Sequence, residues 1–247
     1  RSEFDAARNT WTTYTQSGKS YRSRYVIAAT GLFGAPRQPD IPGLGTFSGK
    51  VMHTALWDHG YALAGKRVGL IGTGASAVQV VPSIAPEVGA LKVFQRTPIW
   101  VGPKRDFPIT DKARSGFFFS APGLRLWRAA SELALQVASF FAVNYRRYKG
   151  LTRRIEAHLA KHMREMVDDP ALHKVLLPEY GLGCNRPALS NEYLESFNRH
   201  NVDLVARGIE KITQEGVVTS DGVKHTLDAL ILGTGFQTFE KGNAPRF

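Results

Sequence analysis

The feature that most constrains this chain is a glycine turn placed between an apolar strand and a helix. Residues 68–71 run directly into Gly72-Thr73-Gly74-Ala75-Ser76-Ala77. In the pattern G-x-G-x-x-A, the first glycine permits a tight turn, the second lets a pyrophosphate approach the backbone, and the small third residue allows the helix to pack closely on the sheet. We therefore expect a dinucleotide pyrophosphate at this helix N-terminus. The alternative is a tight turn that binds nothing.

The next strand, 91–95, completes a βαβ unit and indicates which dinucleotide is bound. NAD-specific sites place a carboxylate on the ribose hydroxyls about 20 residues after the first glycine. Residues 91–97 contain no Asp or Glu, but they contain Arg96, followed by Thr97. A guanidinium at this position would pair with a 2′-phosphate, which favours NADP. The alternative is that Arg96 is an ordinary surface cation.

Short apolar runs predict the rest of an α/β fold. Residues 11–15, a turn at 17–19 and residues 21–29 predict a hairpin whose second strand ends at Thr30-Gly31. The proline-rich segment 34–45 is a connector. Strands are expected at 201–206, 209–213, 217–219 and 227–232. The last of these ends in Thr234-Gly235, so two apolar strands share a Thr-Gly ending.

Residues 103–178 have the periodicity of helices, which we expect at 124–148 and 151–167, with a breaker at 168–170. The apolar run at 133–145 is interrupted by Gln136, Ser139 and Asn144, so a bilayer span is not expected. The broad apolar side of 124–148 leaves peripheral membrane contact open. The basic run 145–149 is interpreted as a solvated helix face. His158 and His162 lack a third ligand at suitable spacing, so no metal is assigned.

The net charge and the cysteine content limit which partners and which cellular location we expect for the chain. Its 247 residues carry a formal charge of +11, which suits an anionic partner such as a phosphate-bearing cofactor. A basic protein that binds nucleic acid or lipid is a further class, but it rests on charge alone, and we expect no nucleic-acid partner. Cys184 is the one cysteine, which excludes an intramolecular disulfide and fits a reducing, cytoplasmic location.

A longer pattern resembles a known family. Phe47-x-Gly49-x-x-x-His53-x-x-x-Trp57-Asp58 resembles the fingerprint of class B flavoprotein monooxygenases, and specifically of the Baeyer–Villiger branch. The glycine turn, the run Gln95-Arg96-Thr97-Pro98 and the two Thr-Gly strand ends occur in the family order. The resemblance spans most of the chain and is weakest across 103–178.

The resemblance implies two dinucleotide-binding, Rossmann-like domains, one for FAD and one for NADP, with a helical insertion in the NADP domain. It implies that hydride from NADPH reduces the flavin and that O₂ then forms a C4a-peroxyflavin, which oxygenates a ketone. The expected division of the chain is 1–50, part of the FAD domain and a linker; 51–102, the first part of the NADP domain; 103–180, the insertion; 181–236, the second part of the NADP domain; and 237–247, the return to the FAD domain.

The resemblance also assigns roles to residues. Cys184-Asn185-Arg186-Pro187 matches the segment with the catalytic arginine, so Arg186 is expected in a water-poor pocket, where a permanent charge stabilises oxyanions. The alternative for Arg186 is a structural pair with Glu179 or Glu192. His53 is expected at the interdomain hinge, coupling NADPH binding to flavin reduction rather than acting as a base. The cofactor-binding residues implied are Gly72, Thr73, Gly74, Ala75, Ser76, Ala77, Arg96 and Thr97 for NADP, and Thr30, Gly31, Thr234 and Gly235 at the flavin side.

Two departures from the family pattern shape the prediction. Asn185 stands where family members often have Lys, which leaves more of the 2′-phosphate to Arg96. No G-x-G-x-x-G precedes Tyr25, so we expect the chain to be a piece of a longer protein. The FAD pyrophosphate turn is expected in that protein but is not in this piece. The alternatives are a flavin-containing monooxygenase that oxygenates nitrogen or sulfur, or an NADP(H)-binding module without catalysis.

Overall fold

A five-stranded parallel sheet forms the centre of the computed structural model, which describes residues 1–29, 31, 33–104, 106, 108–119, 121–144 and 147–238. Its strand order is β4-β13-β5-β6-β9, and every neighbouring pair is parallel. The strands are β4 (Lys50–His53), β13 (Ala229–Leu232), β5 (Arg67–Ile71), β6 (Ala90–Phe94) and β9 (Val202–Val205). Parallel sheets are covered on both faces, which is why these strands are almost continuously apolar.

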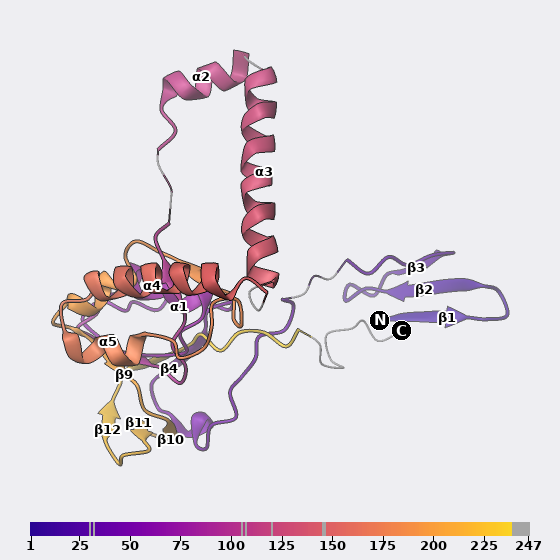
Figure 1. Ribbon diagram of the computed structural model, residues 1–247. Coiled ribbons are helices and arrows are strands. Elements are labelled where there is room, and N and C mark those ends of the chain that lie inside the picture. The colour runs from indigo at the N-terminus through magenta and orange to yellow at the C-terminus, as the bar shows by residue number, and fades with distance from the viewer. Residues whose placement is uncertain are drawn as a thin grey trace.

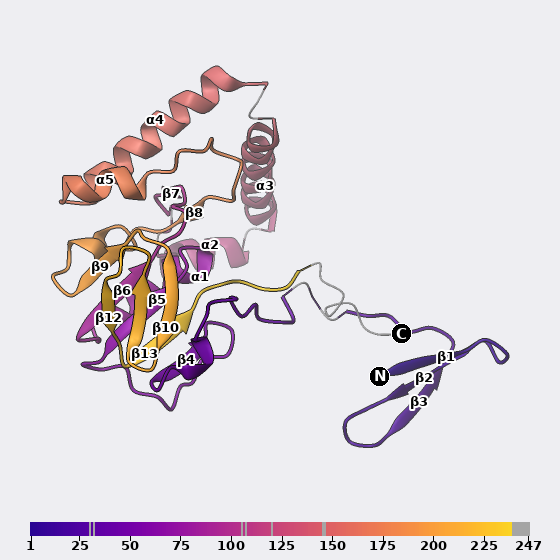
Figure 2. The ribbon, with the colours of Figure 1, turned by 90° about the horizontal axis from the view of Figure 1, so that it is seen from below.

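Alternate residues of the central strands pack into two separate cores. Val68 and Leu70 of β5 face the core under helix α1 (Ala75–Ile84), to which Ala77 and Val81 contribute. On β13, Leu230 and Leu232 face the other core. There they meet a small antiparallel sheet of β10 (Ile209–Thr213), β11 (Gly216–Thr219) and β12 (Lys224–Thr226). The result is a three-layer α/β domain, seen from below in Figure 2.

A charged pair holds the two central strands together where they begin. The Arg67 Nε and Nη2 donate to the two carboxylate oxygens of Asp228, over 3.1 and 2.6 Å. The backbone N–H of Arg67 donates to the same carboxylate over 2.8 Å. The Arg67 side chain and amide together lower the pKa of Asp228 to about 2. The pair therefore supports the backbone register of β5 against β13, and its charge contribution is lost when Asp228 is protonated.

We expect Asp228→Asn to lower the thermal unfolding midpoint at pH 7 by a few degrees. The folded-state pKa of Asp228 lies below the usual value of about 3.9, so its contribution is complete above pH 4 and is lost as the pH falls toward 2. The variant and the parent should thus converge in stability across that window. Because both side chains are partly exposed, solvent screening keeps the effect modest.

The matched control is Asp203→Asn, which breaks a pair with Lys92 on β9 and β6. The Asp203 carboxylate is more exposed than that of Asp228, and we expect little change in the midpoint at any pH. Unfolding curves read by circular dichroism at pH 7 and pH 2.5 measure both variants. Equal losses for the two at pH 7 would contradict the register role of Asp228.

Helices follow the sheet unit, as the sequence predicts for residues 103–178. They are α2 (Asp111–Phe119), α3 (Ala121–Val143), α4 (Lys149–Glu165) and α5 (Pro170–Leu176). One predicted boundary was wrong, since α3 ends at Val143 rather than at residue 148. The predicted breaker at 168–170 is confirmed, because it separates α4 from α5. Asp169 starts α5 by accepting a hydrogen bond from the Ala171 N–H, and Pro170 occupies the first helical position.

The N-terminal sheet is separate from the central sheet along the chain and in Figure 1. It consists of β1 (Ser2–Asp5), β2 (Thr10–Tyr14) and β3 (Ser20–Ser23), all antiparallel. The hairpin prediction is confirmed, but its second strand stops at Ser23 rather than at residue 29. Within the described chain no strand pairs with residues 24–29, and Tyr25 and Ile27 are 83% and 91% exposed. Residues 24–29 therefore form no strand, because they make no backbone hydrogen-bond ladder with a neighbouring described strand.

The remaining elements are short. They are β7 (Val101–Gly102), β8 (Ala188–Leu189) and the 3₁₀ turns η1 (Leu44–Thr46) and η2 (Glu195–Asn198). Residues 103–178 contain no described helix with the length and apolarity needed to traverse a bilayer, and the same holds for the other described helices.

Candidate functional site: the glycine turn and the Arg186 pocket

Gly72 directly follows β5 and has a positive backbone φ that other residues rarely adopt. Its φ is +114°, and a Cβ built there would lie 2.5 Å from the carbonyl oxygen of Gly233. Gly233 follows β13, and its N–H donates to the Ile71 carbonyl over 2.9 Å. The ends of the two central strands therefore approach each other too closely for a side chain. This is the tight turn that the sequence pattern predicts for the first glycine.

Gly74 serves a different purpose from Gly72. It is the N-cap residue of α1, with φ −74°, and a Cβ built on it would meet nothing within 4 Å. No side chain caps this helix, and its first turn holds no acidic residue. The first backbone N–H groups of α1 are thus left for an external acceptor. Open space in front of uncapped N–H groups fits a pyrophosphate.

Ala77, the third small position, is fully buried in the core beneath α1. A Cβ built on Gly233 would lie 3.9 Å from the Cβ of Ala77, so the helix passes close to the end of β13. Of the six residues predicted in this turn, Gly74 and Ala75 reach the adjoining pocket, whereas Gly72, Thr73, Ser76 and Ala77 do not line it.

Arg96 lies beside the turn, at the end of the neighbouring strand. The N–H of Gly72 donates to the Phe94 carbonyl over 3.1 Å, and Thr73 Oγ1 donates to the Thr97 carbonyl over 2.8 Å. These two hydrogen bonds hold the segment that carries Arg96 against the glycine turn. Arg96 itself is exposed and does not line the pocket. Its position fits both the 2′-phosphate role and the surface-cation alternative.

A pocket of about 1280 Å³ brings together segments far apart in the sequence. The start of α1 contributes Gly74 and Ala75, and the loop before β8 contributes Arg186. Helices α3 and α4 supply apolar walls that include Phe141 and Ile155. The insertion therefore closes one side of a cavity whose other side is the glycine turn.

Arg186 lines this pocket but is an exposed residue. The expectation of a water-poor setting was therefore wrong for the chain as described, because the loop at 183–187 is open to solvent. Among the ion pairs of the described residues, none joins Arg186 to Glu179 or Glu192, so the structural pairing has no support. The guanidinium remains available to an anion in the pocket.

Hydrogen bonds on the near side of the Arg186 loop fix where it starts. Trp100 Nε1 donates to the Tyr180 carbonyl over 3.0 Å, while Tyr180 Oη donates to the Pro98 carbonyl over 2.9 Å. The N–H of Leu182 donates to Glu156 Oε1 of helix α4 over 2.7 Å. The insertion helix thus holds the loop directly. Glu156 and Tyr180 were not singled out from sequence, because no local pattern indicates a contact between residues so far apart.

A second set of contacts fixes where the loop ends. Strand β8 pairs in parallel with β7, and the pairing continues through the Asn191 side chain. Its Oδ1 accepts from the Lys104 N–H over 2.9 Å, and its Nδ2 donates to the Lys104 carbonyl over 3.0 Å. Arg186 is therefore carried on a loop tied at both ends to the segment that follows Arg96.

His53, at the end of β4, is buried and both of its ring nitrogens are engaged. Nδ1 accepts from the Ala55 N–H over 3.1 Å, and Nε2 lies 3.0 Å from the Gly235 carbonyl oxygen. These two contacts require the tautomer with its proton on Nε2. A ring held in this way has no free nitrogen to abstract a proton, which agrees with a hinge role rather than that of a base.

His53 touches the place where two connectors cross. Gly235, with φ +80°, also accepts from the Arg37 N–H over 2.9 Å, and Thr234 Oγ1 donates to the Arg37 carbonyl over 2.5 Å. The ring of Phe236 packs edge-on against His53. Segments 35–37 and 234–237 thus run side by side. Gly31 has φ +77° and is exposed, while Thr30 lies outside the described residues.

Comparisons with known proteins agree with this architecture. Residues 5–109 match the family model described as pyridine nucleotide-disulphide oxidoreductase. A Baeyer–Villiger monooxygenase from Streptomyces coelicolor is 38% identical over 100% of this chain and 47% of its own length. A Baeyer–Villiger monooxygenase from Pseudomonas aeruginosa is 36% identical over 94% of this chain and 44% of its own length.

Solved structures give the same result. A cyclohexanone monooxygenase from Rhodococcus bound to NADP⁺ is 33% identical, with a TM-score of 0.80 over 95% of this chain and 50% of that one. The structure of an OTEMO complex with FAD and NADP is 27% identical, with a TM-score of 0.80 over 95% of this chain and 52% of that one. The chain spans about half the length of the relatives it matches. Its similarity in sequence and in fold to Baeyer–Villiger monooxygenases extends over nearly the whole of this chain.

Proposed function

We propose that this chain is the NADP(H)-binding half of an FAD-dependent monooxygenase that inserts oxygen next to a ketone carbonyl. The observation that carries the proposal is the shared pocket of Gly74, Ala75 and Arg186. An uncapped helix N-terminus and a guanidinium with no ion pair among the described residues lie in one cavity, as a site that binds NADP(H) beside a reacting oxyanion requires. The alternative oxygenation of nitrogen or sulfur rests on the same two cofactors, and no contact of this chain favours it over ketones.

The overall reaction balances with one ketone, O₂, NADPH and a proton giving an ester or lactone, NADP⁺ and water. When bound, NADPH supplies the hydride and FAD the oxygen-activating chemistry. The residues of this chain bind and orient. The N–H groups at the start of α1 would hold the pyrophosphate, and Arg96 the 2′-phosphate. Arg186 would hold negative charge that develops on the reacting oxygen, without giving up a proton.

The residue roles and the domain division follow the same proposal. His53 positions the crossing of the two connectors, and Gly31, Thr234 and Gly235 lie at the flavin side. The NADP domain is 51–102 and 181–236, with the insertion at 103–180 and flavin-side segments at 1–50 and 237–247. The single cysteine of the chain, Cys184, fits a cytoplasmic location for the protein.

Arg96→Ala tests the cofactor assignment. Because a guanidinium–phosphate pair contributes about 1.5 to 3 kcal/mol, we expect NADPH affinity to fall by roughly tenfold to a hundredfold and NADH affinity to stay unchanged. Titration calorimetry or fluorescence of the bound nicotinamide measures both. The control is Arg207→Ala, which removes an exposed arginine in the loop before β10 that pairs with Asp221. Equal loss of both cofactors would contradict the 2′-phosphate role.

Oxygenation itself is tested on the protein as its natural gene encodes it. We expect NADPH-dependent O₂ uptake that is stimulated by a cyclic ketone and yields a lactone. Arg186→Ala should abolish product formation, with NADPH affinity changed far less than by Arg96→Ala. Product formation that survives Arg186→Ala would remove Arg186 from the site.

A further inference from the structure

Arg96 lies on a short segment just beyond the pairing of the central strands. Strand β6 ends at Phe94, and its pairing with β9 extends one residue further, through the Gln95 N–H, which donates to the Val205 carbonyl over 2.9 Å. Pro98, two residues after Arg96, has no N–H with which to continue a ladder. The placement of Arg96 therefore depends on side chains that reach this segment from elsewhere in the chain.

Two hydroxyl groups hold the two carbonyls that follow Arg96. Thr73 Oγ1, in the glycine turn, donates to the Thr97 carbonyl over 2.8 Å, and Tyr180 Oη donates to the Pro98 carbonyl over 2.9 Å. Thr73 is buried, and Tyr180 is partly buried against the core under α1. Because both hydrogen bonds are partly buried, leaving either carbonyl without its donor would be costly.

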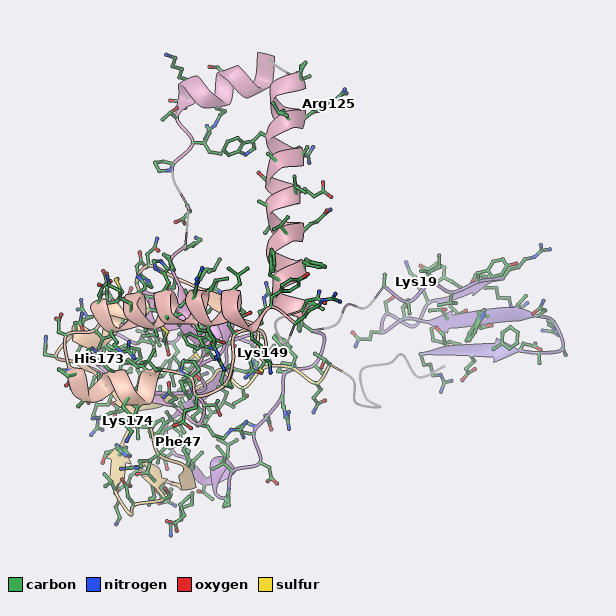
Figure 3. All side chains as sticks on the ribbon, in the orientation of Figure 1. Lys19, Phe47, Arg125, Lys149, His173 and Lys174 are labelled. Carbon is green, nitrogen blue, oxygen red and sulfur yellow. The ribbon has the colours of Figure 1, made fainter. Side chains whose placement is uncertain are left out.

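A third side chain holds the residue before Arg96. Gln95 is buried, and its Nε2 donates to the Val175 carbonyl over 2.6 Å. Val175 directly follows Lys174, whose label in Figure 3 marks the last turn of helix α5. Arg96 itself is exposed, and among the described residues it takes part in no ion pair. Its guanidinium is thus carried on a backbone held on both sides and is available to an external anion.

Tyr180 also joins this segment to the start of the loop that carries Arg186. Its carbonyl accepts from Trp100 Nε1 over 3.0 Å, while its hydroxyl donates to the Pro98 carbonyl. The two hydrogen bonds therefore run in opposite directions between the same two segments. Two such contacts fix orientation as well as distance, whereas a single one would let the segments pivot. The hydroxyl of Tyr180 is the part of this clamp that acts on the backbone nearest Arg96.

We propose that Tyr180 is a positioning residue that sets a preference for NADPH over NADH, because it holds the Arg96 segment in place for the 2′-phosphate. The inference rests on the proposed function, in which Arg96 binds that phosphate. A bidentate guanidinium–phosphate pair needs its planar fork at a fixed place, and it binds more tightly when the backbone behind it is already ordered. NADH has no 2′-phosphate, so the loss of the hydroxyl acts on one cofactor and not on the other.

Tyr180→Phe tests this in the FAD-loaded protein as its natural gene encodes it. Calorimetric titration with NADP⁺ and with NAD⁺ measures binding without reduction of the flavin. Because one neutral hydrogen bond is lost, NADP⁺ affinity should fall by about threefold to tenfold, while NAD⁺ affinity should stay within about twofold. The ratio of kcat/KM for NADPH to that for NADH should fall by the same factor as the NADP⁺ affinity.

The Thr73 hydroxyl provides a second, independent test of the same segment. Tyr180→Phe combined with Thr73→Val removes the donors of both carbonyls, and NADP⁺ affinity should fall by about tenfold or more. Thr73→Ser keeps the hydroxyl and should restore the affinity to that of Tyr180→Phe alone. An affinity that stays equally low with valine or serine at position 73 would contradict the role of these hydrogen bonds.

Tyr61→Phe is the matched control. Tyr61 Oη donates to the Asp228 carbonyl over 3.3 Å, at the end of the central sheet opposite the glycine turn. Both phenylalanine variants should lose a similar, small amount of stability in urea unfolding, because each loses one hydrogen bond from a tyrosine hydroxyl to a backbone carbonyl. Only Tyr180→Phe should change the preference between the two cofactors.

A Tyr180→Phe protein that loses stability but keeps the cofactor preference of the parent would overturn the proposal, since the hydroxyl would then serve the fold alone. Equal losses of NADP⁺ and NAD⁺ affinity would overturn it as well. Failure of the proposed function gives a different result, in which Arg96→Ala also leaves the cofactor preference unchanged. That result would reject the 2′-phosphate role of Arg96 together with the role of Tyr180.

Discussion

Replacing Gly72 with alanine should destabilise this protein by on the order of 3 kcal/mol. The native φ of +114° is strained for any L side chain, and the new Cβ would lie 2.5 Å from the Gly233 carbonyl oxygen. Backbone rather than a flexible side chain is in the way, so strands β5 and β13 must separate where they end. Urea unfolding followed by circular dichroism measures the loss. A Gly72→Ala protein as stable as the parent would contradict the geometry of the turn.

The matched variant is Gly74→Ala, two residues further along. Its φ of −74° suits alanine, and a Cβ there meets no atom of the chain within 4 Å. The free energy of unfolding should therefore stay within a few tenths of a kcal/mol of the parent's. It could rise slightly, because alanine lowers the conformational entropy of the unfolded chain. If a pyrophosphate lies against this backbone, the added methyl group occupies its place, and NADPH affinity should fall by at least about tenfold.

The two glycines thus separate folding from binding within one turn. Full NADPH affinity in a folded Gly74→Ala protein would show that the turn binds no pyrophosphate, which is the alternative reading of the sequence pattern. Loss of folding in both variants would show that the open space at Gly74 is needed by the chain itself.

Replacing His53 with alanine should cost about 2 to 3 kcal/mol and loosen the two connectors. The substitution removes the acceptor of the Ala55 N–H and the donor to the Gly235 carbonyl, and leaves a cavity beside Phe236. Because Gly235 also accepts from Arg37, the crossing should persist but open more often. Limited proteolysis around 33–38 and 234–238 should become faster.

His53→Asn separates the contribution of the Ala55 contact from that of the Gly235 contact. An asparagine side chain can still accept from the N–H two residues on, as Asp58 does from Gly60, but it is too short to reach Gly235. We expect this variant to recover part of the stability lost in His53→Ala while its connectors remain as sensitive to protease. Unchanged proteolysis in both variants would exclude His53 from holding the crossing.

Much of the site was predictable because its signals are local. The residues from Gly72 to Ala77 encode both a backbone conformation and a helix start, and Arg96 lies at a fixed distance after them. The Arg67–Asp228 pair, the contact of Glu156 with Leu182 and the bracing of Lys104 by Asn191 were not predictable. Each joins residues 26 or more apart in the sequence, through an ordinary polar side chain on at least one side, and no spacing rule relates the two residues.

The sequence by itself determined the alternation of strands and helices, the tight turn at Gly72 and the helical character of residues 103–178, because hydrophobic periodicity and glycine conformations act over a few residues. The tertiary structure alone decided three further properties. It showed that Arg186 lines a pocket with the start of α1 but stays exposed, that His53 has both nitrogens occupied, and that the described side chains of α3 lie outside both cores. These depend on which distant segments pack together, and burial of apolar surface across the whole chain sets that packing.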